Sequence, residues 1–191
     1  MVDKDNVGKM ADEDELERVL EKELGPAATD LFLVPTSGSP GSSLPYDQDA
    51  AWKYYSDYCS HGNECTSGGD GEFQLDCTHF VCHGLHKGNI KVNSPEAVCD
   101  TDLCIRVAEL AAAFKNSVGR YTNVTRVPSF SQTKRGDFCF IVSWFGYSKD
   151  HAMVAGATVG ENGGRVWGHT SHRCDTNTSW AGQTLIFYRI S

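Results

Sequence analysis

One cysteine lies in a sequence context that favours a reactive sulfur. Cys77 directly follows Asp76, whose side chain is typical of a helix N-cap, and residues 77–86 then have the pattern of a helix that ends at Gly88. A cysteine directly after an N-cap lies in the first helical turn, where backbone N–H groups and the helix dipole favour the thiolate. Because the same N–H groups can bind an oxyanion, this position predicts a nucleophile and part of its oxyanion hole.

Two histidines in the C-terminal half are candidates for the partners of this cysteine. A cysteine nucleophile needs a base that a third polar group holds in place. His151 begins one apolar stretch (residues 151–154, HAMV), and His169 ends another (residues 166–169, VWGH). If these stretches form neighbouring antiparallel strands, His169 can orient the ring of His151 while His151 faces Cys77. His172 is the alternative to His169 in the orienting role.

These residues give the chain a resemblance to the amidase-domain family, a branch of the papain-like superfamily close to the NlpC-type cell-wall peptidases. The resemblance runs from about Tyr46 to the C-terminus. At three positions after the nucleophile, the family usually has Asn, Ser and Gln where this chain has His79, Cys82 and His83, which bears on substrate preference. Five segments carry the resemblance: 46–55 (YDQDAAWKYY), 76–81 (DCTHFV), 135–138 (RGDF), 150–154 (DHAMV) and 168–170 (GHT).

The resemblance implies a papain-like, NlpC-like α+β fold, in which a nucleophile at a helix N-terminus packs on an antiparallel sheet. It also implies hydrolysis of an amide bond in a peptide or peptidoglycan-type substrate through a thioester. Cys77 would be the nucleophile, His151 the general base and His169 the orienting residue, and no cofactor is expected. The second oxyanion donor stays open between Gln74 and an upstream tyrosine such as Tyr54.

Other functions fit the same residues. A cysteine protease or deamidase that acts on a protein as a delivered toxin would use the same nucleophile. So would a transferase that resolves the thioester with an amine instead of water. A binding module that keeps the fold without activity is the alternative from another functional class.

A row of histidines on the helix after Cys77 raises the alternative of zinc. His79, His83 and His86 recur at i, i+4 and i+7, with Cys82 beside them. Two histidines at i and i+4 can bind zinc, as on metalloprotease helices. The glutamate of that motif is missing, and three ligands from one short helix make an awkward site. The pattern therefore favours a polar face beside the nucleophile over a metal site.

Helical patterns come before strand patterns along the chain. Helices are predicted over residues 46–58, with Asp47 or Asp49 near the start, over 77–86, and over 94–119 with a break near residue 100. Without βαβ alternation, this order predicts an α+β domain with an antiparallel sheet. The predicted strands are 121–127, 138–142, 152–159, 165–169 and 185–190.

The first 45 residues differ in character from the rest. Residues 12–24 carry Leu and Val at helical spacing with acids between them, which predicts an amphipathic helix ended by Gly25-Pro26. Residues 35–45 are rich in Pro, Gly and Ser and predict a linker. We therefore expect a peripheral extension over 1–45 and a papain-like amidase domain over 46–191.

Charge and length exclude several functional classes. The 191 residues contain 17 Lys and Arg against 25 Asp and Glu, for a net charge of −8. Residues 1–24 hold nine acids and four bases, so the body is close to neutral and poorly suited to phosphate backbones of nucleic acids. No apolar run approaches the roughly 20 residues that span a bilayer. The N-terminus has no secretory-signal pattern, so we expect a cytoplasmic monomer unless another route exports it to the cell wall.

The chain has eight cysteines, and seven remain when Cys77 is set aside. Cys59 and Cys65 flank a Gly/Ser-rich loop and could close a small disulfide, and Cys99 and Cys104 could do likewise. Cys139 alternates with two phenylalanines in a predicted strand and is expected in the core. The pairing itself cannot be deduced from the sequence.

Overall fold

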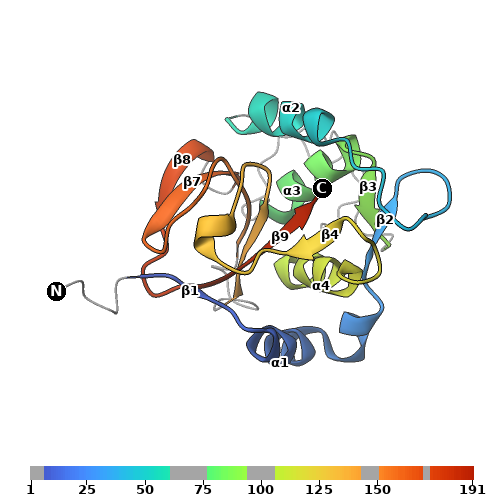
Figure 1. The fold of residues 1–191 in the computed structure, drawn as a ribbon, viewed down its shortest axis with the longest axis horizontal. Helices are drawn as coiled ribbons and strands as arrows, with labels where there is room; N and C mark the ends of the chain where they lie inside the picture. The colour runs from blue at the N-terminus through green and yellow to red at the C-terminus, as the bar shows by residue number, and fades with distance from the viewer. Residues whose placement is uncertain (1–6, 61–76, 94–105, 143–150, 170–172) are drawn as a thin grey trace.

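Seven strands form one sheet in the computed structural model, which describes residues 7–60, 77–93, 106–142, 151–169 and 173–191. The sheet order is β1-β9-β5-β6-β7-β8, and β4 also pairs with β9 (Figure 1). The pairings are antiparallel except that β1 runs parallel to β9. The strands are β1 (Lys9–Met10), β4 (Val124–Arg126), β5 (Phe138–Ile141), β6 (Ala152–Ala155), β7 (Gly163–Gly168), β8 (Arg173–Ser179) and β9 (Thr184–Ile190).

The described residues also form four α-helices, which make the fold α+β, as the order of patterns predicts. They are α1 (Glu13–Leu24), α2 (Gln48–Tyr58), α3 (Cys77–Lys87) and α4 (Val107–Ser117). The 3-10 turns η2 (Gly25–Thr29) and η4 (Phe130–Gln132) and a small antiparallel sheet of β2 (Leu33–Pro35) and β3 (Ile90–Val92) complete the set. The predicted helix start at residues 94–95 lies outside the described residues. None of the helices in the described ranges is long and apolar enough to cross a membrane.

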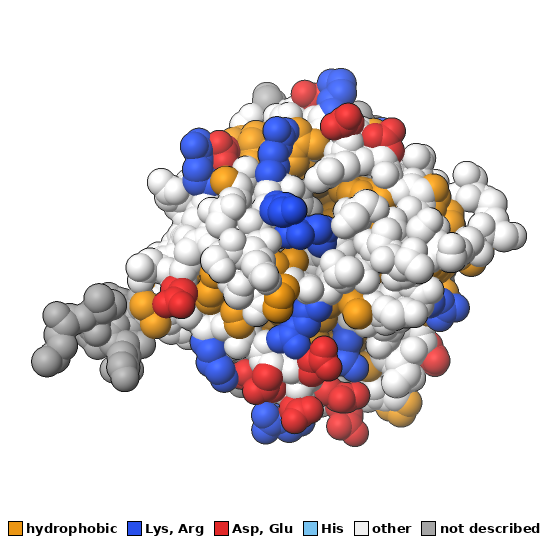
Figure 2. Space-filling view, viewed as in Figure 1, with side chains coloured by type: hydrophobic (Ala, Val, Ile, Leu, Met, Phe, Trp, Pro, Cys, Tyr) orange, Lys and Arg blue, Asp and Glu red, His pale blue; other side chains and the backbone are white. Residues whose placement is uncertain are grey.

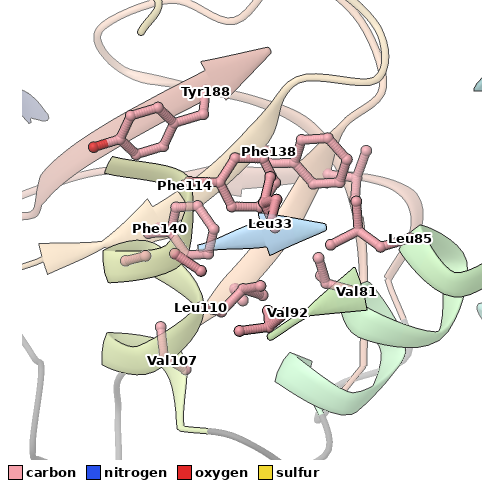
Figure 3. Packing of buried hydrophobic residues seen from close by; sticks show 14 of the residues in the cluster. Leu33, Val81, Leu85, Val92, Val107, Leu110, Phe114, Phe138, Phe140 and Tyr188 are labelled. Atoms are coloured by element: carbon pink, nitrogen blue, oxygen red, sulfur yellow. The ribbon is translucent and has the colours of Figure 1, made fainter. Parts of the chain in front are cut away.

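The sheet has a hydrophobic cluster on each face. Phe138 and Phe140 of β5 point toward the helices, whereas Cys139 between them belongs to the second cluster, because side chains alternate along a strand. On the helical side, Phe114 of α4 lies against Phe138, with ring centroids 4.7 Å apart, and stacks on Tyr188 at 5.6 Å (Figure 3). This packing fixes α4 on the sheet.

The N-terminal segment is part of this core and not the peripheral extension that its composition indicates. Leu16 and Leu20 of α1 are buried in the helical-side cluster, where α1 packs on α4. Before α1, β1 pairs with β9, and after it Leu33 of β2 is fully buried. The acids of the amphipathic α1 face outward, and they gather along the lower edge of the molecule in Figure 2, where Figure 1 shows α1. The apolar side of the helix is therefore a packing surface.

Close contact between α2 and α3 depends on a glycine. α2 begins after Asp47, whose carboxylate accepts a hydrogen bond from the Ala50 N–H at 2.9 Å, as an N-cap does. Tyr55 of α2 packs against α3 and donates a hydrogen bond from its hydroxyl to the Val81 carbonyl at 3.0 Å. A Cβ atom on Gly84 would lie 2.1 Å from the Tyr55 ring. The two helices can approach this closely only because residue 84 has no side chain.

We therefore expect Gly84→Ala to lower the free energy of unfolding by about 1–3 kcal/mol, the usual cost of overpacking. Alanine normally stabilises a helix relative to glycine, so the sign of the change is diagnostic. His86→Ala at an exposed position of the same helix is the control and should leave stability nearly unchanged. Urea denaturation followed by circular dichroism measures both variants. A Gly84→Ala variant as stable as the wild type would contradict the described helix contact.

Candidate active site

Cys77 is the first described residue of α3, and the helix start that the sequence predicts at this point stays a prediction. Its thiol is buried, takes part in no disulfide, and lies 3.9 Å from the Thr78 hydroxyl. At a helix start, the first N–H groups have no acceptor within the helix, so they and the helix dipole would favour negative charge on this sulfur. The predicted cap, Asp76, lies outside the described residues.

His169 follows β7, and a hydrogen bond and a ring contact hold it in place. Its Nε2 lies 2.6 Å from the backbone carbonyl oxygen of Tyr58, the last residue of α2. A carbonyl oxygen only accepts hydrogen bonds, so Nε2 carries the proton and Nδ1 of the neutral ring is an acceptor. The ring stacks on Phe80, with centroids 4.2 Å apart, and Phe80 lies one helical turn after Cys77. These contacts fix His169 beside the first turns of α3.

His151 directly precedes β6 and is buried. Its backbone carbonyl accepts a hydrogen bond from the Ile141 N–H at 3.0 Å, which anchors it to β5. β6 and β7 are antiparallel neighbours, and Val154 pairs with Trp167. Two residues further in this register, His169 lies opposite Ala152, the neighbour of His151. The two histidines thus lie at the same end of adjacent strands, and α3 packs on both strands.

The structure therefore brings the backbones of the three predicted residues to one region, where α3, β6 and β7 meet. The hydrogen bonds from His151 to His169 and to Cys77 stay predictions. His172, the alternative orienting residue, and Gln74, one candidate oxyanion donor, lie outside the described residues.

The histidine row on α3 divides into a buried part and an exposed part. Nδ1 of His83 lies 2.8 Å from the Tyr54 hydroxyl of α2, and the rings of His79 and His83 lie 5.7 Å apart. His86 is exposed, and partial burial with the nearby Lys87 lowers its pKa. In the described ranges, no group of three or more His, Cys, Asp or Glu could hold a metal ion. The buried pair serves the α2–α3 interface, and an oxyanion role for Tyr54 stays a prediction.

A disulfide joins Cys59 to Cys174, so the suggested pairing of Cys59 with Cys65 is wrong. The bond connects the end of α2 to β8, a strand that the sequence does not predict because its residues are polar and lack apolar alternation. Cys139 is fully buried in the core, as predicted. The suggested pair Cys99–Cys104 lies outside the described residues.

Arg173, which sequence reasoning does not single out, brings positive charge to this region. It pairs with Gly168 of β7, and its Nη1 lies 3.1 Å from the Met153 sulfur of β6. Burial lowers the pKa of Arg173, whereas attraction to a negative charge on the nearby Cys77 or Cys139 sulfur would raise it. Burial raises the pKa of the Cys139 thiol, which keeps that sulfur neutral. Of these two sulfurs, Cys77 is therefore the one whose thiolate the guanidinium can favour.

Comparisons with known proteins add no relative to this description. No protein-family model matches the chain. No curated protein and no solved structure matches it either.

Replacing the Arg173 cation should slow alkylation of Cys77. The thiolate is the reactive form, and loss of a nearby positive charge moves its formation to higher pH. We expect the iodoacetamide rate of Cys77 at pH 6 to fall by about threefold to tenfold in Arg173→Gln, measured by peptide mass spectrometry. Arg165→Gln is the matched control. It also removes a positive charge, but from the neighbouring strand β7, where Arg165 forms an ion pair with Asp175. Equal rates in Arg173→Gln and the wild type would show that the guanidinium does not act on Cys77.

Proposed function

We propose that the protein is a papain-like, NlpC-like cysteine hydrolase that cleaves amide bonds with Cys77, His151 and His169. The observation that carries the proposal is the fixation of His169. Its imidazole is buried against Phe80, one turn from Cys77, and donates Nε2–H to the Tyr58 carbonyl. Its Nδ1 is then the acceptor that an orienting residue must offer to a neighbouring histidine.

The first half of the reaction forms a thioester. His151 takes the proton from Sγ of Cys77, and the thiolate attacks the carbonyl carbon of the substrate amide. The backbone N–H at the start of α3 donates a hydrogen bond to the resulting oxyanion. The C–N bond then breaks, and His151 returns its proton to the leaving amine. The sulfur stays bonded to the acyl group.

The second half releases the acid. His151 takes a proton from a water molecule, whose oxygen attacks the thioester carbon through the same oxyanion. The C–S bond breaks, the thiol of Cys77 recovers its proton, and a carboxylic acid leaves. His169 keeps the ring of His151 in the orientation that both proton transfers need, as the third member of a triad does.

Selective alkylation tests the activated sulfur, and the chain contains its own control. Cys82 lies on the same helix, takes part in no disulfide and is more exposed than Cys77. At pH 6, iodoacetamide should label Cys77 at least about tenfold faster than Cys82, because an activated cysteine is a thiolate well below the ordinary thiol range. His151→Ala should remove most of this difference. Faster labelling of Cys82 in the wild type would overturn the proposal.

The substrate class follows from a second assay. Peptidoglycan fragments incubated with the wild type should lose part of their stem peptides, as read by mass spectrometry, and Cys77→Ser should leave them intact. Intact fragments, together with cleavage or deamidation of a protein, would instead identify a protein substrate. Transfer of the acyl group to an added amine in place of water would identify a transferase.

A further inference from the structure

The Cys59–Cys174 disulfide lies next to the contacts that hold His169, the residue that orients His151 in the proposed reaction. Cys59 directly follows Tyr58, whose carbonyl oxygen accepts the hydrogen bond from Nε2 of His169. Cys174 directly follows Arg173, which pairs across the sheet with Gly168, the residue before His169. The disulfide, the strand pairing and the hydrogen bond therefore form a closed loop of contacts that includes His169.

The Tyr58 carbonyl, which accepts this hydrogen bond, must be held in place by residues outside its own helix. Tyr58 is the last residue of α2, and the final carbonyl groups of a helix have no donor within the helix. Helix ends also fray, so the direction of this carbonyl depends on what holds the residues around it. The Tyr58 ring stacks on Tyr54 at 4.8 Å, which holds the side chain, and the disulfide at the next residue holds the backbone.

The position of this carbonyl favours a proton on one nitrogen of His169. While the oxygen lies 2.6 Å from Nε2, the ring with its proton on Nε2 gains a buried hydrogen bond. The ring with its proton on Nδ1 would place two acceptors against each other at this point. A displaced carbonyl would remove this contribution in a side chain that is only 1% exposed.

We propose that the Cys59–Cys174 disulfide is a positioning element for the reaction, because it holds the Tyr58 carbonyl that fixes the proton of His169 on Nε2. The inference rests on the proposed function for its catalytic meaning. Its structural content concerns His169 alone and can be tested separately. The titratable groups linked to these contacts are Tyr58 and Tyr54 of α2, His83 of α3, which bonds to the Tyr54 hydroxyl, and Arg173 of β8, which pairs with the residue before His169.

The test uses the paired variant Cys59→Ser/Cys174→Ser, which removes the disulfide without adding thiols. Nitrogen-15 NMR of the His169 ring at pH 7.5 reports which nitrogen is protonated. The wild type should give one set of shifts with the proton on Nε2, and the variant should give averaged shifts. The alkylation rate of Cys77 at pH 6 should fall by about tenfold, as on loss of a group that orients a catalytic ring.

The test must separate a general loss of protein stability from a displacement of the Tyr58 carbonyl. The disulfide closes a loop of 115 residues, so its removal should cost stability in any case. Arg189→Gln is the matched destabilised control, because it breaks the ion pair with Asp137 at 2.7 Å between β9 and β5. It should leave both the His169 shifts and the Cys77 rate unchanged. If the serine pair does not fold, the wild type reduced with a phosphine in the cold takes its place.

Each outcome has one meaning. A folded variant with the single Nε2–H state and an unchanged Cys77 rate would overturn the positioning role. A wild type in which Cys77 is not selectively labelled would overturn the proposed function, while the NMR comparison would still decide whether the disulfide fixes His169.

Discussion

The hydrogen bond between His169 and the Tyr58 carbonyl is the interaction on which the rest of the site depends. It joins the end of α2 to the end of β7 across a separation of 111 residues. α3 contacts both of these elements, and Phe80 of α3 stacks on the His169 ring, so the bond and the helix meet at one side chain. If either partner of such a buried hydrogen bond moves, its stabilising free energy is lost, and each polar group is then buried without this partner.

Close approach of helices and sheet makes that geometry possible. Gly84 admits the ring of Tyr55 between α2 and α3, and at Gly168 of β7 a Cβ atom would lie 3.3 Å from the side chain of Met153 on β6. The two positions without side chains thus allow α2 to pack closely on α3 and β7 to pack closely on β6. The aromatic contacts of Phe80 and Phe114 then fill the remaining volume and hold the arrangement rigid.

The sequence predicts the parts of this structure that follow from local periodicity. The start of α2 follows from Asp47, a helix is found over the residues after Cys77 where the pattern predicts one, and the strands with apolar alternation, such as β5, are found where expected. The sequence does not predict β8 or its disulfide, because a polar edge strand has no periodic signal and cysteine pairing depends on tertiary contacts. The composition of the N-terminal segment predicts a peripheral extension, and here too tertiary contacts make the difference. The apolar stripe of residues 12–24 predicts a helix, but it does not reveal that this stripe packs on α4.

The edges of the main sheet show a further consequence of the N-terminal segment. One side of β9 pairs with β5, and the other side is occupied first by β1 and then by β4. The opposite edge is β8, whose exposed polar residues and positive backbone φ at Asp175 interrupt a flat strand. Open, regular edges invite pairing with other chains. Together with β4, the first strand therefore occupies backbone groups of β9 that would otherwise be open to pairing with another chain.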